Sequence, residues 1–137
     1  NPLESPEDLA RHILLHDGSP DADDSCPDWA MWLAARGIKS VDGARGPRFN
    51  QSSLVIEAAA NGRGVALAKQ TLAQADLDAG RLVIPFEIPT AVDFAYYVVH
   101  PKAKGRLPQV KAFVAWLKDE AAAHEAALLT MDNGAGI

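Results

Sequence analysis

The stretch that decides the fold of this chain is Arg48–Ala68, with the sequence RFNQSSLVIEAAANGRGVALA. It predicts a strand, a polar turn at Asn50–Ser53, a helix at Leu54–Ala60 and a second strand at Val65–Leu67. Because this helix is apolar apart from Glu57, we expect it to be covered on most sides. The stretch therefore predicts a βαβ unit, in which a helix joins two parallel strands.

The polar turn of this unit carries residue types suited to two roles. Asn50, Ser52 and Ser53 can satisfy the first backbone N–H groups of a helix as N-caps. The same N–H groups, together with the helix dipole, can receive an anionic or polar ligand. The residues leave both roles open, because one side chain can cap the helix while another points outward.

Composition excludes several classes of protein. The 137 residues are 48% hydrophobic, which is enough for one buried core, and 18 acidic against 13 basic side chains give a net charge of −5. This charge argues against direct binding of a phosphate backbone. The single cysteine, Cys26, excludes an internal disulfide and fits a reducing compartment. The chain begins without methionine, and we expect it to be a piece of a longer protein.

The rest of the chain alternates helices and strands joined by short loops. Helices are expected from Ser5, from Pro27 to Gly37, over Leu72–Ala79 and from Pro108, where Val110, Phe113, Val114, Leu117 and Ala121 recur at helical spacing. Strands are expected at Ile13–Leu15, Arg81–Ile84 and Phe94–Val99, with a surface loop at Asp17–Pro27 and a disordered tail from about Ala126. This order predicts an α/β fold with a mostly parallel sheet, in which ligands collect beyond the carboxyl ends of the strands.

Five segments, in order and in register, carry a resemblance to a known family. They are PLESPEDLARHILLH from Pro2, W..WL from Trp29, GPRFNQSSLVIEAAANGRGVALA from Gly46, L..GRLVIPF from Leu77 and AYYVVHPKAKGRLPQVKAFVAWLKDE from Ala95. Together they cover roughly residues 2–123, and they resemble the effector-binding region of LysR-type transcriptional regulators. Within that family the segments are most similar to the branch of the glycine-cleavage activator and the β-lactamase regulator.

The resemblance implies a fold similar to type 2 periplasmic binding proteins, in which two lobes enclose an effector. Residues 1–88 would form lobe II with its hinge, residues 89–125 would be the C-terminal strand and helix that return to lobe I, and residues 126–137 would be the disordered tail. Members of the family begin with a winged helix-turn-helix, a linker helix and the first half of lobe I, which this sequence does not include. We hypothesise that Phe94–Val99 and the apolar face of the last helix are covered by a second copy of the chain.

The resemblance also places candidate ligand contacts. Asn50, Ser52 and Ser53 lie where similar regulators contact an effector, and with Lys69 they suit a polar or anionic compound. Tyr96 lies where similar regulators place an aromatic side chain at the cleft, although a core tyrosine is the equal alternative. Tyr97 is expected to point to the opposite face of the same strand.

Metal, cofactor and catalytic sites are not predicted. Asp21, Asp23 and Ser25 mimic the opening of a calcium loop, but Cys26 stands where a glycine is needed and Trp32 where a glutamate is needed. The four histidines are too scattered for a metal site with local spacing, and neither a G-x-S-x-G motif nor a nucleotide-binding loop is present.

The sequence therefore predicts a non-enzymatic, cytoplasmic effector-sensing domain of a LysR-type regulator. Its partners would be a small-molecule effector and other copies of itself, with DNA bound only through a segment outside this chain and no membrane contact. Two alternatives stay open: a solute-binding protein of a transporter, and an oligomerisation module with an empty cleft.

Overall fold

The computed structural model describes residues 3–19, 26–86, 90 and 96–132. The chain forms two compact units, residues 1–94 and residues 95–137. The assignment of these units to lobe II and to a part of lobe I stays a prediction.

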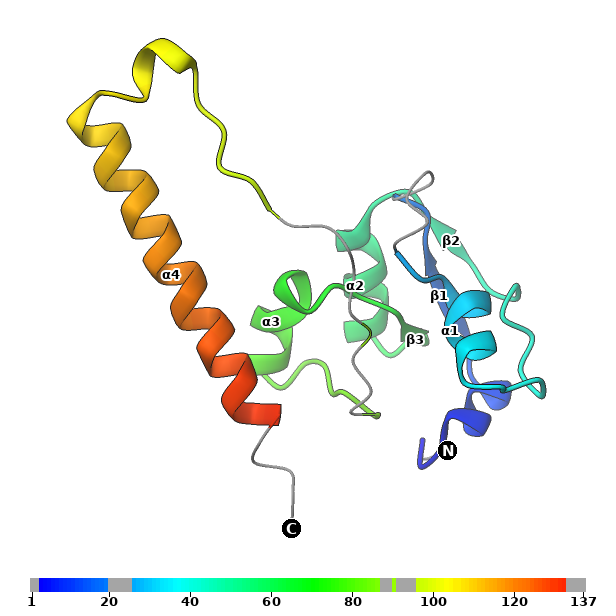
Figure 1. Cartoon of the computed structure of the whole chain (residues 1–137). Coiled ribbons are helices and arrows are strands. Elements are labelled where there is room, and N and C mark those ends of the chain that lie inside the picture. The colour runs from blue at the N-terminus through cyan, green and yellow to red at the C-terminus, as the bar shows by residue number, and fades with distance from the viewer. Residues whose placement is uncertain (1–2, 20–25, 87–89, 91–95, 133–137) are drawn as a thin grey trace. The chain divides into compact units, whose positions relative to one another are not determined.

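The first unit is a small α/β layer structure (Figure 1). Its elements are the 3₁₀ helix η1 (Pro6–Arg11), β1 (Leu14–Asp17), α1 (Trp29–Ala35), β2 (Arg48–Phe49), α2 (Ser52–Ala60), β3 (Val65–Ala66) and α3 (Gln70–Asp78). The three strands form a parallel sheet in the order β2-β1-β3, with His16 opposite Arg48 and Leu14 opposite Val65. The predicted βαβ unit and the α/β class are confirmed.

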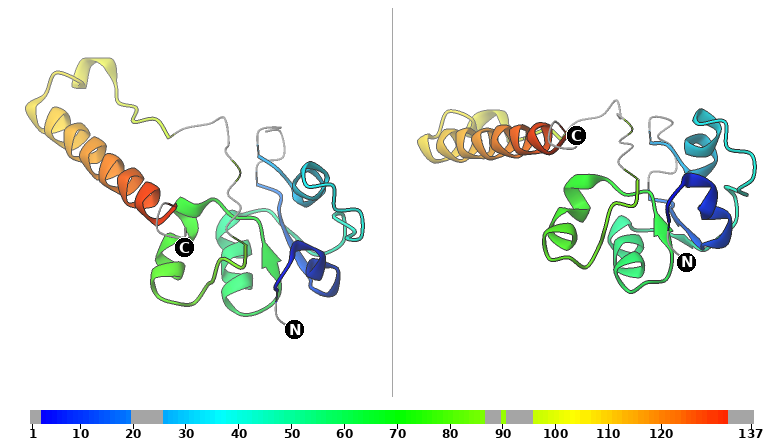
Figure 2. Two further views of the ribbon diagram at one scale, coloured as in Figure 1. Left: turned by 60° about the horizontal axis from the view of Figure 1, so that its bottom comes forward. Right: turned by 90° about the horizontal axis from the view of Figure 1, so that it is seen from below.

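Buried apolar side chains on both faces of the central strand β1 fix the layers. Leu14 and Leu15 are each 1% exposed and, as neighbours in a strand, point to opposite faces. η1 and α1 lie on one face of the sheet and α2 packs on the other (Figures 1 and 2). The core on the α1 face consists of Leu9, Leu14, Trp29, Trp32, Leu33 and Val41.

Helix α1 is joined to β1 by a buried hydrogen bond. The indole Nε1 of Trp29 donates to the backbone oxygen of Leu15 at 3.0 Å, and the Trp29 ring meets the Trp32 ring edge to face. The helix starts at Trp29 rather than at Pro27, because the Asp28 carboxylate accepts the Met31 N–H at 2.7 Å and serves as its N-cap. The predicted apolar face of this helix is thus confirmed, and the helix starts two positions later than predicted.

Two glycines allow the backbone to approach β1 closely. Gly46 has φ +126°, and a Cβ atom there would lie 1.8 Å from the Leu14 carbonyl oxygen. Gly64 has φ +158°, and a Cβ atom there would lie 2.3 Å from the Ile13 oxygen. The strands β2 and β3 reach their places beside β1 only through these side-chain-free positions.

Helix α2 differs from the prediction at its start and in its cover. It begins at Ser52, and Gln51 occupies the N-cap position without a side-chain capping bond. The predicted capping role of the serines is therefore wrong, because both lie inside the first turn. Only Val55 and Ile56 are buried, whereas Leu54 is 46% exposed, so the helix is covered on one side and not on most sides.

The strand predicted at Arg81–Ile84 is absent from the described part of the chain. The backbone N–H groups of Arg81 and Leu82 instead donate to the Asp76 carbonyl oxygen, at 2.9 and 3.2 Å. These bonds satisfy a free carbonyl at the C-terminal end of α3. The Arg81 guanidinium also pairs with the Asp76 carboxylate, so this segment finishes a helix instead of extending a sheet.

The second unit consists of an extended segment, the 3₁₀ helix η2 (Lys102–Lys104) and the long helix α4 (Pro108–Asp132). Residues 96–99 form no strand, since a strand requires a neighbour to accept and donate its hydrogen bonds, and the described residues provide none. Helix α4 begins at Pro108 as predicted. It continues to Asp132, beyond the predicted start of disorder at Ala126, because the alanine-rich sequence favours a helix.

Some predictions fall outside the described residues. These are the calcium-loop candidates Asp21, Asp23 and Ser25, the start of the predicted strand at Phe94, and the tail after Asp132. Within the described ranges, no helix has the length and apolar content that crossing a membrane requires.

Candidate functional site at the strand ends

Three parallel strands of the first unit end at the same edge of the sheet. β1 ends at Asp17, β2 at Phe49 and β3 at Ala66, and the Gly18 N–H donates to the Phe49 oxygen at 2.7 Å. Helix α2 starts directly after β2, and Lys69 is the N-cap residue of α3 shortly after β3. In open α/β sheets this edge is the usual place of a ligand, and helix N-termini there favour negative charge.

Asp17 is the centre of the polar network at this edge. Its Oδ1 accepts the Ser19 N–H at 2.9 Å and the Ser19 hydroxyl at 2.6 Å. The Ser19 and Ser52 hydroxyls lie within hydrogen-bond distance of each other, at 3.0 Å. This chain of bonds joins the loop after β1 to the first residue of α2.

The network keeps the Asp17 carboxylate ionised. Burial disfavours the charge and acts to raise its pKa, but the hydrogen bonds from Ser19 and Ser52 and the positive charge of Lys69 outweigh this effect. The pKa of Asp17 is therefore lowered from its ordinary value of 3.8. The strand ends thus bring together the Asp17 carboxylate, the Ser19 and Ser52 hydroxyls and the positive charge of Lys69.

Substitution of Asp17 with asparagine is expected to flatten the acid limb of the stability curve. A carboxyl whose pKa is lower in the folded state stabilises that state above its unfolded pKa, and this contribution disappears as the pH falls through the folded value. Below about pH 4, the free energy of unfolding of the Asp17→Asn chain should therefore depend less on pH than that of the unmodified chain. Urea denaturation at a series of pH values measures this slope. Asp78→Asn, which changes an exposed carboxylate on α3, is the matched control, and an equal flattening in both variants would contradict the assignment.

The four ligand contacts predicted from the sequence lie in different parts of the structure. Ser52 is half-buried within the network, and Asn50 is exposed in the turn before it. Ser53 lies on the rim of a hollow of about 260 Å³ between α2 and α3, together with Leu72 and Asp76. Tyr96 belongs to the second unit and is 71% exposed.

Asp17 and Ser19 were not among the residues predicted from the sequence. Asp17 is the last residue of β1, so the rule that ligands collect at strand ends applies to it as much as to Asn50. The sequence analysis instead assigned Asp17 to the surface loop predicted at Asp17–Pro27, because polar residues follow it. Lys69, which the sequence offered as an additional contact, acts on Asp17 electrostatically.

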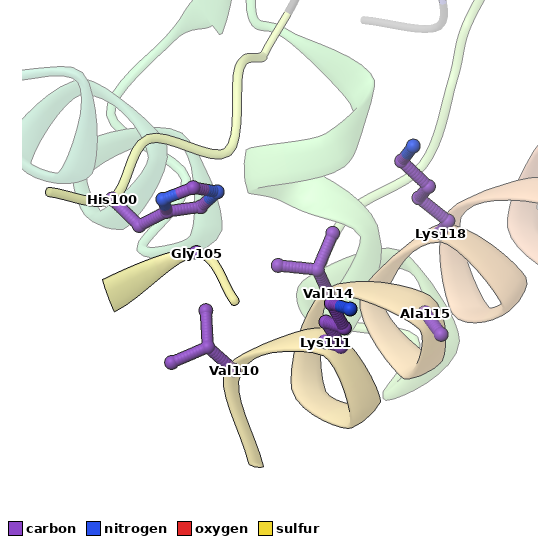
Figure 3. A pocket seen from close by; sticks show the side chains of 7 residues that line it. All are labelled: His100, Gly105, Val110, Lys111, Val114, Ala115 and Lys118. Atoms are coloured by element: carbon purple, nitrogen blue, oxygen red, sulfur yellow. The ribbon is translucent and has the colours of Figure 1, made fainter. Parts of the chain in front are cut away.

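Two further features of the described residues are a buried histidine and a second hollow. His16 is buried, and its Nε2 lies 3.0 Å from the Arg45 carbonyl oxygen, so it has the structural role expected of a lone histidine. Residues 3–19, 26–86, 90 and 96–132 contain no group of side chains suited to a metal ion. The second unit has a hollow of about 290 Å³, into which His100, Val110 and Val114 project (Figure 3).

Comparisons with known proteins show what this chain is similar to. A family model described as the LysR substrate binding domain matches residues 1–122. The chain is 39% identical over 124 residues to the glycine cleavage system transcriptional activator of Escherichia coli K12, covering 90% of this chain and 39% of that protein. It is 32% identical over 120 residues to the transcriptional activator AmpR of Providencia stuartii, covering 88% and 38%. The chain thus spans about two fifths of the length of these relatives.

A solved structure shows the same fold. The effector domain of the transcriptional regulator AmpR of Pseudomonas aeruginosa superposes with a TM-score of 0.65 at 30% identity, covering 91% of this chain and 58% of that chain. The α/β architecture is therefore periplasmic-binding-protein-like, as predicted. The relatives are regulators and the family is non-enzymatic, which agrees with the absence of a catalytic motif in the sequence. The chain belongs to the LysR substrate-binding domain family.

Proposed function

We propose that this chain is the effector-sensing part of a bacterial LysR-type transcriptional regulator that binds a small polar or anionic metabolite. The observation that carries the proposal is the network at the strand ends, where Asp17, Ser52 and Lys69 meet the start of α2. Charged and hydroxyl groups on rigid strand and helix ends can orient a small polar molecule. The names of the relatives support regulation rather than transport.

The proposed ligand contacts are Asn50, Ser52, Ser53 and Tyr96. The first three follow β2 at the carboxyl edge of the sheet, where the N-terminus of α2 favours an anionic group. Tyr96 would supply an aromatic contact. A metabolite held between two lobes would favour one of their relative arrangements, which is a shift of population rather than a chemical step.

The wider role of the parent protein follows from the same proposal. DNA would be bound by a segment outside this chain, and the regulator would act in the cytoplasm. Self-association is also proposed, because large apolar side chains of the second unit are exposed. These are Tyr96, Tyr97, Val98, Val99, Phe113 and Trp116.

A thermal-shift screen of anionic and amino-acid-like metabolites tests the effector site. A ligand at 100 times its Kd should stabilise the folded chain by about 2.7 kcal/mol, which raises the unfolding midpoint by several degrees. Ser52→Ala and Ser53→Ala should reduce or abolish that increase. Ser40→Ala, which changes an exposed serine in the loop after α1, should leave it unchanged.

The same screen can contradict the proposal. If the folded chain shows no shift with any metabolite, the domain would be an interaction module with an empty cleft. A shift that survives both Ser52→Ala and Ser53→Ala would place the ligand away from the start of α2.

A further inference from the structure

The segment before α4, residues 100–106, forms a turn that we call the basic turn. All 18 acidic residues of the chain lie outside residues 94–118, whereas five of the 13 basic residues lie within that range. Three of the five stand at alternate positions of the basic turn and two lie on α4: Lys102, Lys104, Arg106, Lys111 and Lys118. All five are exposed. A chain with a net charge of −5 thus carries one strongly positive surface segment.

These five cations are not neutralised by their neighbours. Among the residues that the structure describes, none of the five forms an ion pair with a carboxylate. The first turn of α4 contains no acidic residue either. Because the N-terminus of a helix carries a partial positive charge, cations beside it are repelled by the helix as well as by one another. This arrangement lowers the stability of the free chain, and an anionic partner would relieve the repulsion.

Backbone hydrogen bonds and a ring contact give the basic turn a defined shape. The Lys104 N–H donates to the Pro101 carbonyl oxygen at 2.9 Å, and the Leu107 N–H donates to the Lys104 oxygen at 3.1 Å. The His100 ring lies against Gly105, where an added Cβ would come within 2.4 Å of the ring carbon Cε1 (Figure 3). The cations of the basic turn are therefore presented by a folded segment.

The residue types of the basic turn favour a phosphate backbone over a protein surface. Protein interfaces are centred on large side chains such as Trp, Tyr, Phe and Met, and the basic turn contains none of these. Lysine and arginine are the side chains that neutralise the phosphates of nucleic acids. Because connecting segments run over the protein surface and unpaired cations are costly to bury, the basic turn is accessible to a large anionic partner.

We propose that the basic turn is an auxiliary contact of this domain with the phosphate backbone of DNA. The choice of DNA rests on the proposed function, in which another segment of the parent regulator holds DNA nearby. Contacts from Lys102, Lys104 and Arg106 would add affinity without reading the base sequence, because they go to phosphate oxygens. The net charge of −5 did not predict this contact, since a sum over the chain does not show where the charges lie.

Fluorescence anisotropy with a short labelled DNA duplex of arbitrary sequence tests this contact in the full 137-residue chain. The unmodified chain should bind the duplex at low salt, and the logarithm of its affinity should fall linearly with the logarithm of the salt concentration. The triple variant Lys102→Gln, Lys104→Gln and Arg106→Gln should bind at least about tenfold more weakly. The slope of its salt dependence should be smaller by about three, close to one for each phosphate contact that is lost.

A second triple variant, Lys39→Gln, Arg48→Gln and Arg63→Gln, is the matched control. It removes the same charge from exposed positions of the first unit, so it should bind the duplex like the unmodified chain. Far-UV circular dichroism establishes that both triple variants keep their helix content. A metabolite that raises the unfolding midpoint should do so equally in both, because neither changes the proposed effector contacts. The DNA contact and the effector site are thus tested separately.

Three outcomes would overturn the DNA contact. The first is an unmodified chain that does not bind the duplex at low salt. The second is an equal loss of affinity in both triple variants, which would trace the binding to net charge and not to the basic turn. The third is displacement of the duplex by polyglutamate at an equal concentration of charge, which would point to an acidic protein segment as the partner.

Discussion

Replacement of Gly46 by alanine is expected to unfold the first unit. The new Cβ would lie 1.8 Å from the Leu14 carbonyl oxygen, and the backbone at this position has φ +126°. Leu14 belongs to the central strand and is 1% exposed, so it cannot move without disturbing the core. We expect a loss of about 4 kcal/mol or more in the free energy of unfolding, comparable to the whole stability of a small domain. Urea denaturation followed by circular dichroism measures this loss.

Gly62→Ala is the matched control for that experiment. Gly62 also has a positive φ of +68°, but no atom lies within 4 Å of the place its Cβ would take. Only the conformational cost of a left-handed alanine applies, about 1–2 kcal/mol. If the two variants were equally stable, the close approach of Gly46 to β1 would not be a constraint on the fold.

Trp29→Ala should produce the other large loss of stability. The side chain is 3% exposed in the core on the α1 face, and its indole donates the hydrogen bond to Leu15. Removal of such a ring leaves a cavity and typically costs about 3–5 kcal/mol. The measurement is the midpoint of urea unfolding, with an unchanged slope showing that the unfolded state is comparable.

Trp29→Phe separates packing from hydrogen bonding at this position. Phenylalanine retains most of the apolar volume but cannot donate to Leu15, so the expected loss is about 1–2 kcal/mol. Met31→Ala, at a residue of α1 that is 47% exposed, should change stability little. A Trp29→Phe chain as unstable as Trp29→Ala would mean that the hydrogen bond, and not the ring volume, dominates.

The elements that the sequence predicted correctly are those marked by residues within a single segment. The Arg48–Ala68 unit is marked by turn residues and glycines, and α4 is marked by its helical spacing, so both are confirmed. The prediction was wrong at residues 81–84 and 96–99, where β-prone residues predicted strands that the structure does not contain. Strand propensity measures how well a side chain fits a sheet, but it does not supply the neighbouring strand.

The candidate site was only partly predictable for a related reason. Ser52 was found because it lies at a recognisable strand-to-helix turn, but its partners Asp17 and Ser19 lie far away in the sequence. Their proximity depends on the parallel register of β1 and β2, which places Asp17 opposite Phe49. A periodic pattern within one segment carries no information about such a register.

The central position of β1 determines when the first unit can form during synthesis. β1 leaves the ribosome before its neighbours β2 and β3, which lie at residues 48–49 and 65–66. Until Ala66 has emerged, the sheet lacks one of its edges, and Leu15 lacks the strand that lies beside it. Closing such long chain segments costs entropy before the contacts form, so folding of this unit follows translation of β3 rather than proceeding strand by strand.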